Sequence, residues 1–320
     1  MHSGGGSTPN DVLTWAWDKQ SQWSQAAGNL KKSLFLARKI ALWLAVSAAV
    51  LATLTVQLAG VSPAWGRGLA LAAAVAAAFI PVAQRSTSRT RVQDWTRARS
   101  VSEALKAEVY RFMAGVAPYR GTDRQEVFTK RTGQFLSDAH ELTRLTVGIL
   151  PKPRALPQVS DVDSYITERV RQQMDTYYRE QSAKMKRLGD RYRTIVNVLA
   201  FVAVLLGVAA SSTGTHQFAG WAPVVTTVIA AVAAYSAVNR FDALMLEYSR
   251  TYEQLERLLL ERPRAAGPDR QAEEDRFVAE AEAVISVQNE SWMARSVEAV
   301  DAGDRGGSPE SPAAQAPDGS

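Results

Sequence analysis

Two long blocks without charge dominate the pattern of hydrophobic and polar positions along the chain. The first extends from Ile40 to Gln84 and is interrupted by one charged residue, Arg67, whereas the second extends from Thr194 to Asn239 without a charge. A helix of about 20 apolar residues crosses a bilayer core of about 30 Å. Each block is therefore long enough for two crossings, and the pattern predicts two transmembrane hairpins.

Each block has a natural division between its two spans. The turn residues Thr213–His216 divide the second block near its middle, and Arg67, which is expected to reach outward to the membrane surface, divides the first. The predicted spans are Ile40–Gly60, Gly66–Gln84, Ile195–Ser212 and Phe218–Val238. The alternative, a buried hairpin of a soluble protein, is disfavoured because soluble cores rarely contain two such blocks with strongly basic flanks.

Basic residues gather on the sides of the blocks that face away from the hairpin tips. Lys39 precedes the first block and Arg85 follows it, while Arg193 and Arg240 flank the second block. By the positive-inside rule, this placement predicts a multi-pass protein of the inner (plasma) membrane, with both termini and the central region in the cytoplasm.

Apolar residues outside the blocks recur at helical spacings. Val101, Leu105, Val109, Phe112 and Val116 are separated by three or four positions, and no segment alternates as a strand would. The expected fold class is an all-α membrane protein with two tandem transmembrane helical hairpins, four spans in all, and cytoplasmic helical bundle extensions.

The same order of features occurs twice along the chain. One constant offset pairs Lys31 with Lys184 and Trp95 with Tyr248, and it also superimposes the hairpins. The predicted layout is a disordered N-terminus (1–11), a first hairpin unit (12–148), a Pro-rich linker (149–160), a second hairpin unit (161–300) and a disordered tail (301–320). The linker is expected to be extended and stiff, and to let the two halves move relative to one another.

A Gly-x-Asp-Arg-Gln turn is present in both units. Its aspartates, Asp123 and Asp269, are expected to cap the helix that follows, and Asp123 with Glu126 resembles a capping box. The alternative, a ligand-binding Asp-Arg-Gln triplet, is disfavoured because capping explains the position of the aspartates without further assumptions.

The net charge of +5 is unevenly distributed, because Arg85–Arg193 is basic and Arg240–Ser320 is acidic. Two interpretations remain open: complementary surfaces that dock the halves or neighbouring subunits, and solvated helix faces. Nucleic acid is not expected as a partner. The basic residues cluster at the membrane boundaries, where anionic lipid attracts them, so the lipid bilayer is the expected partner.

Residues that carry chemistry are scarce. The chain has no cysteine and three histidines, which excludes cysteine nucleophiles and thiolate metal sites and disfavours a histidine metal cluster. It contains no P-loop and no convergent set of acid and base residues. We therefore expect no enzyme activity, no catalytic residue, no cofactor and no metal. Apart from Arg67 at a hairpin tip, the spans contain no charged residue, which argues against a proton-coupled transporter.

A few polar residues lie inside the predicted spans. The candidates are Thr53, Gln57, Asn197, Ser211, Thr226 and Thr227. They are interpreted either as helix-packing positions or as the weakly polar wall of a pore. Four helices are too few to enclose a wide pore, so a pore would require a homo-oligomer.

The basic helix, the short hairpin, the helices that follow it and the closing Glu290-Ser291-Trp292 together resemble the SLATT family, the SMODS- and SLOG-associating two-transmembrane effector domains of bacteria. The resemblance covers Val12–Val147 and Asp161–Val297 as two tandem copies, and the first departs from it with Glu141-Leu142-Thr143. It implies a pore-forming or membrane-perturbing effector in a conflict system, gated by its cytoplasmic helices and activated by a nucleotide-sensing partner protein. The alternative function is a non-conducting membrane scaffold or signalling adaptor.

Overall fold

The computed structural model describes residues 9–59, 62–213, 220–262 and 269–286. All regular secondary structure in these ranges is helical, which confirms the all-α prediction. The first unit contains α1 (Pro9–Ala59), α2 (Pro63–Arg85), α3 (Arg89–Ala114), α4 (Arg124–Asp138) and a 3₁₀ helix (His140–Leu145). The second unit contains α5 (Val162–Tyr165), two π-helical stretches (Ile166–Arg171 and Gln173–Tyr178), α6 (Arg179–Thr213), α8 (Ala222–Asn239), α9 (Phe241–Glu261) and a helix over 270–286.

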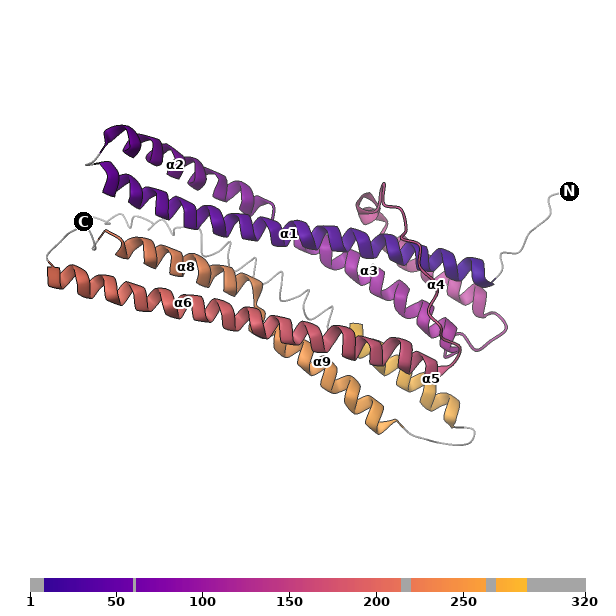
Figure 1. The fold of residues 1–320 in the computed structure, drawn as a ribbon. Coiled ribbons are helices and arrows are strands. Elements are labelled where there is room, and N and C mark those ends of the chain that lie inside the picture. Colours follow the sequence, from indigo (N-terminus) through magenta and orange to yellow (C-terminus); the bar gives the residue numbers. More distant parts are fainter. Residues whose placement is uncertain (1–8, 60–61, 214–219, 263–268, 287–320) are drawn as a thin grey trace, which may run out of the picture.

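Two long helical rods run along the length of the molecule (Figure 1). One is α1, and the other continues without a break from α5 through the π-helical stretches into α6. The rods begin at Pro9 and Val162, which are separated by the same offset that pairs Lys31 with Lys184. At one end, α2 folds back along α1 and α8 along α6, whereas α3, α4 and α9 lie toward the other end (Figure 1). We name the first end the apolar array (40–59, α2, 195–213 and α8) and the remaining helices the polar bundle.

Four of the described helices are long and apolar enough to cross a membrane. They are Asn10–Leu58, Pro63–Arg85, Val162–Ser212 and Ala222–Glu261. The four predicted membrane helices are therefore confirmed, with two differences at their starts. The second begins at Pro63, because proline is favoured in the first turn of a helix. The fourth begins at Ala222, since Gly220 and Trp221 form a turn.

Two helices end at residues in the left-handed conformation. Gly115, at φ 66°, ends α3, which is ordinary because glycine has no Cβ to clash. Arg240, at φ 49°, separates α8 from α9, and its backbone N–H donates to the carbonyls of Ser236 and Ala237. A non-glycine residue rarely adopts this conformation, so Arg240 makes a fixed bend between the apolar array and the polar bundle.

The polar bundle has an aromatic core to which both units contribute. The ring of Trp17 lies 6.3 Å from that of Tyr110, which lies 6.2 Å from Tyr165 of the second unit, and all three side chains are buried. On the surface, Arg120 of the basic segment pairs with Asp275 of the acidic segment at 2.8 Å. Ion pairs between the two segments are therefore present within one chain, while other charged residues of both segments, such as Arg187 and Glu280, lie exposed on helix faces.

The Pro-rich linker lies along α1 in an extended form. The indole of Trp17 donates to the carbonyl of Ala155 at 3.0 Å, and the guanidinium of Arg154 lies 3.6 Å from the centre of the same indole. Further along, Gln22 donates to the carbonyl of Ile149 at 3.0 Å. The linker is extended as predicted, and these contacts fasten it to the first rod. That the two halves move relative to one another stays a prediction.

The predicted disordered N-terminus is too long at its inner end, since α1 begins at Pro9. The helix starts there because Leu13 and Ala16 are spaced to bury one face against the aromatic core. Other predictions concern residues outside the described ranges: the disorder of 1–8 and 301–320, the turn at 214–216, and the closing Glu290-Ser291-Trp292.

Candidate functional site

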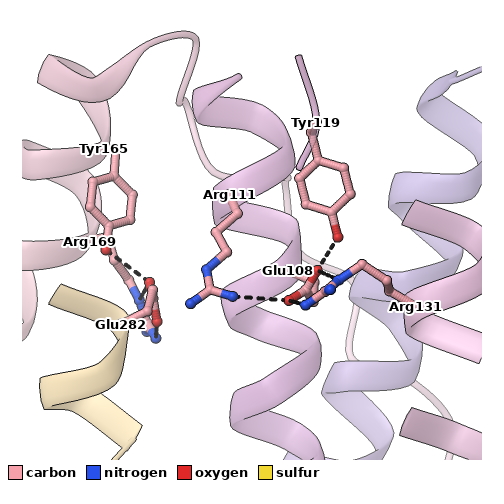
Figure 2. A network of polar contacts seen from close by, with 7 residues as sticks. All are labelled: Glu108, Arg111, Tyr119, Arg131, Tyr165, Arg169 and Glu282. Carbon is pink, nitrogen blue, oxygen red and sulfur yellow. Dashed lines mark hydrogen bonds and ion pairs between the residues drawn. The ribbon is translucent and has the colours of Figure 1, made fainter. Parts of the chain in front are cut away.

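The first cluster of buried charge surrounds Glu108 on α3 (Figure 2). Its carboxylate is 2% exposed and accepts two hydrogen bonds from Arg131 of α4, at 2.9 and 3.0 Å. Arg111 donates to it at 3.3 Å, and the hydroxyl of Tyr119 donates as well. Burial alone would raise the pKa of Glu108, but the hydrogen bonds from Arg131 and Tyr119 outweigh burial and lower it. The carboxylate therefore stays charged and fastens α4 to α3.

The second cluster is centred on Arg169, in the first π-helical stretch of the second unit (Figure 2). Its guanidinium is 1% exposed and donates to both carboxylate oxygens of Glu282, at 3.0 and 2.9 Å. The hydroxyl of Tyr165 donates to the same carboxylate at 3.0 Å. Glu103 of α3 lies 3.8 Å away, and the ring of Tyr110 lies 5.1 Å from the guanidinium. Arg169 thus joins the helix over 270–286 to α3, across the boundary between the units.

Several buried charged groups lie close together in this second cluster and shift one another's pKa values. Burial alone would lower the pKa of Arg169, but the charge and hydrogen bonds of Glu282 together with the charge of Glu103 raise it. One terminal nitrogen of Arg169, Nη1, has no hydrogen-bond partner within the described residues. Burial and the charge of Arg169 lower the pKa of the nearby Lys106 to about 8. A π-helical stretch is rare and is frequently found at functional sites, which adds weight to this cluster as a candidate.

A cavity of about 500 Å³ lies between the two clusters. Its walls come from α3, α4, the 3₁₀ helix, the first π-helical stretch and the helix over 270–286. Its charged lining includes Glu103, Glu108, Arg131, Arg169 and Glu282. Each of these three carboxylates has an arginine within 4 Å. Across the described residues, no group of three or more Asp, Glu or His is placed to hold a metal ion. The chemistry that the clusters support is the ionic coupling of helices from both units.

The six polar residues predicted inside the spans lie on three different helices. Thr53 and Gln57 are half-buried on α1, Asn197 and Ser211 are exposed on α6, and Thr226 and Thr227 are exposed on α8. None of the six lines the cavity between the charge clusters. A single chain therefore does not bring them together as the wall of one passage.

Three of the exposed hydroxyls bond to their own helices. Ser211 donates to the carbonyl of Val208 at 2.8 Å, and Thr226 and Thr227 donate to carbonyls one turn earlier at 3.0 and 2.8 Å. Such bonds let a hydroxyl face an apolar environment. The amide of Asn197 makes no hydrogen bond with another residue in the described ranges. Lipid headgroups, water or a second copy of the chain would have to satisfy it.

Both aspartates predicted to cap a helix directly precede one, but the side chain of Asp123 does not make the expected capping hydrogen bond. Asp123 is the N-cap residue of α4, yet its side chain makes no capping hydrogen bond, so the expected capping box with Glu126 is wrong. Its backbone, at φ −86° and ψ 7°, lacks the extended conformation typical of a capping residue. Asp269 directly precedes the helix over 270–286, and its carbonyl accepts the first helical bond at 3.1 Å. A complete capping box occurs instead at Asp161–Ser164, before α5.

The sequence analysis did not single out Glu108, Arg169 or Glu282. A signal for the first was present, because Glu108 lies three positions after Leu105 and four before Phe112, and both are buried. A charge on the apolar stripe of an amphipathic helix indicates a buried ion pair, since an unpaired charge is too costly to bury. The partner it takes depends on how distant helices pack.

Comparison with known families gives two matches. Residues 165–292 match the SMODS and SLOG-associating 2TM effector domain 1, and residues 21–127 match a protein family of unknown function, DUF4231. No curated protein and no solved structure matches the chain. The two units match different families, so a tandem duplication of one family stays a prediction. The chain is a membrane protein in which residues 165–292 are similar to the SMODS and SLOG-associating two-transmembrane effector domains.

Proposed function

We propose that this membrane effector of a bacterial conflict system assembles as a homo-oligomer and opens or perturbs the membrane. The observation that carries the proposal is the exposure of the apolar array. None of the residues in the most apolar stretch of α1 or of α6 is buried within the chain. Four thinly packed helices do not enclose a passage, so further copies would complete the wall. Asn197, Thr226 and Thr227 then gain polar neighbours that one chain does not supply.

The polar bundle is the proposed gate. Both rods continue from the bundle into the apolar array as single helices, so a displacement at the bundle end is transmitted along them. The shared aromatic core, and the approach of Arg169 in the second rod to Glu103 of α3 at 3.8 Å, hold the two units in one arrangement. A partner that favours a second arrangement would shift the equilibrium between closed and open states.

The test is membrane potential in bacteria during inducible expression, read with a voltage-sensitive dye. The triple variant Asn197→Leu, Thr226→Leu, Thr227→Leu removes the polar groups. The matched control Val198→Leu, Val225→Leu, Val228→Leu changes neighbouring apolar positions on the same helices. The proposal expects depolarisation by the wild type and the control, and none by the triple variant at equal membrane expression. Equal depolarisation by all three proteins would contradict the assignment of these residues.

A non-conducting membrane scaffold or signalling adaptor is the second candidate. It is favoured by the hydroxyls of Ser211, Thr226 and Thr227, which are satisfied by their own helices and need no pore. Under this function the wild type leaves the membrane potential unchanged even when its trigger is co-expressed. The triple variant would still capture the same partners as the wild type.

The remaining features of the proposal follow from charge and composition. The basic flanks Lys39, Arg85, Arg193 and Arg240 support insertion in the inner membrane with both termini in the cytoplasm. The scarcity of cysteine and histidine supports a protein without enzymatic activity or cofactor. We propose that a separate nucleotide-sensing protein docks on the polar bundle as the trigger, and that nucleic acid is not a partner.

A further inference from the structure

A second cavity, of about 480 Å³, lies where the two rods leave the polar bundle. We name it the seam pocket, because both units form its walls. Its lining comes from α1 and α3 of the first unit, and from the second π-helical stretch, α6, α8 and α9 of the second. The basic lining residues are Lys31, Lys32, Lys39, Arg99, Lys184 and Arg191. The pocket contains no aspartate or glutamate in its lining, so its charge is strongly positive.

The inner wall of the seam pocket combines cations with aromatic rings. Lys31 is half-buried, and its ammonium lies 5.9 Å from the ring centres of both Phe35 and Trp95. Arg99 donates to the hydroxyl of Tyr177 at 3.2 Å. The two ring contacts hold the ammonium of Lys31 in place at the back of the pocket but do not neutralise it, because each is made to an uncharged ring.

The lysines of the pocket face no carboxylate in its lining. No carboxylate within the described residues forms an ion pair with Lys31, Lys32 or Lys184. Burial lowers the pKa of Lys31; Tyr177 acts in the opposite direction, and the charges of Arg99 and Lys184 add to the lowering. Elsewhere in the polar bundle the buried charges are matched, as in the Arg169–Glu282 pair. The seam pocket is thus a place where the fold leaves room for an anion.

We propose that the seam pocket binds a phosphate-bearing anion that bridges the two units. Lysine ammonium groups bind phosphate as point charges, and Arg99 adds a planar donor at the back of the pocket. Lys31 comes from the first rod and Lys184 from the second, so the anion is held between them. Its binding favours the arrangement in which the two rods lie together.

The seam pocket lies next to the charge-free blocks, so the phosphate of a lipid headgroup can reach it. Lys39 directly precedes the first charge-free block, and Arg191 lies three residues before the second. Both line the pocket, which therefore opens at the level where phospholipid headgroups lie. The stacked rings of Tyr192 and Phe241, 5.4 Å apart, form an apolar flank on the membrane side. A soluble phosphate compound has the same binding chemistry, so the test separates the two sources.

The test measures binding to the purified full-length protein by native mass spectrometry and by thermal unfolding in nanodiscs. The lipid arm compares pure phosphatidylcholine with phosphatidylcholine containing phosphatidylglycerol. The soluble arm adds inorganic pyrophosphate to the protein in pure phosphatidylcholine. The variant is Lys31→Gln, Lys184→Gln. The matched control is Lys186→Gln, Arg187→Gln, which removes two charges from exposed positions of α6 outside the pocket.

We expect one of the two anions to bind and to raise the melting temperature of the wild type. At about fivefold per lost cation, the Lys31→Gln, Lys184→Gln variant weakens this binding about 25-fold, and the control changes it by less than about threefold. Phosphatidylglycerol binding identifies a lipid, and pyrophosphate binding identifies a soluble ligand. Without an anion, the variant melts at or above the wild-type temperature, because like-charge repulsion is relieved.

Three results would overturn the proposal. The first is that neither phosphatidylglycerol nor pyrophosphate binds the wild type. The second is that the control loses as much binding as the pocket variant. The second result would mean that diffuse surface charge, rather than the pocket, attracts the anion. The third is a pocket variant that unfolds at lower temperature than the wild type in pure phosphatidylcholine, which would show that its lysines already have partners.

Discussion

Replacing Glu282 by glutamine keeps the shape of the side chain and removes the charge that faces Arg169. The guanidinium is 1% exposed and loses a bidentate partner at 3.0 and 2.9 Å. Breaking a buried ion pair from one side costs about 3–5 kcal/mol. Glu103 remains 3.8 Å away and the ring of Tyr110 stays beneath the guanidinium, so we expect the lower end, about 3 kcal/mol. The melting temperature then falls by about 6–12 °C.

The measurement is thermal unfolding of the purified full-length protein, followed by the fluorescence of its tryptophans, of which Trp17 lies in the shared core. Glu280→Gln is the matched control, because it changes an exposed residue on the same helix and should shift stability by less than about 0.5 kcal/mol. The double variant Arg169→Met, Glu282→Leu removes both charges and should recover at least half of the loss, since apolar replacement of a buried pair is often neutral. The reasoning is refuted if Glu282→Gln has the same melting temperature as the Glu280→Gln control, or if the double variant is as unstable as Glu282→Gln.

Two further predictions follow from the same bundle and from its orientation. Lys106 has a pKa of about 8 in the folded chain against an ordinary 10.5, so the unfolded chain binds more protons between these values and stability should rise as the pH increases through this window. In thermal unfolding at pH 7.5 and 9.5, the rise should be smaller in Lys106→Met; an equal rise would assign the effect to other groups. The chain has no cysteine, so a membrane-impermeant maleimide added to intact spheroplasts should label Ala64→Cys, at the first hairpin tip, and not Ser137→Cys, in the polar bundle. Labelling of Ser137→Cys alone would reverse the orientation.

The membrane helices could be predicted from the sequence because their signal is local. A charge-free stretch of sufficient length must be covered by an apolar medium, whatever the rest of the chain does. The blocks at 40–84 and 194–239 carry this signal without help from tertiary contacts. The repeated order of elements was also visible, since one offset aligns the basic positions Lys31 and Lys184 and the starts of both rods.

The tertiary structure alone decided which charges meet. Arg169 and Glu282 are 113 positions apart, and Lys31 and Lys184 come from different units. Periodicity places each residue on a helix face, but the partner depends on how the faces of distant helices pack. The linker shows the same limit: its three prolines predict an extended chain, whereas its attachment to α1 depends on Trp17, more than a hundred residues earlier. Local composition therefore determined where the chain crosses the membrane, and long-range packing determined the charge clusters and the seam pocket.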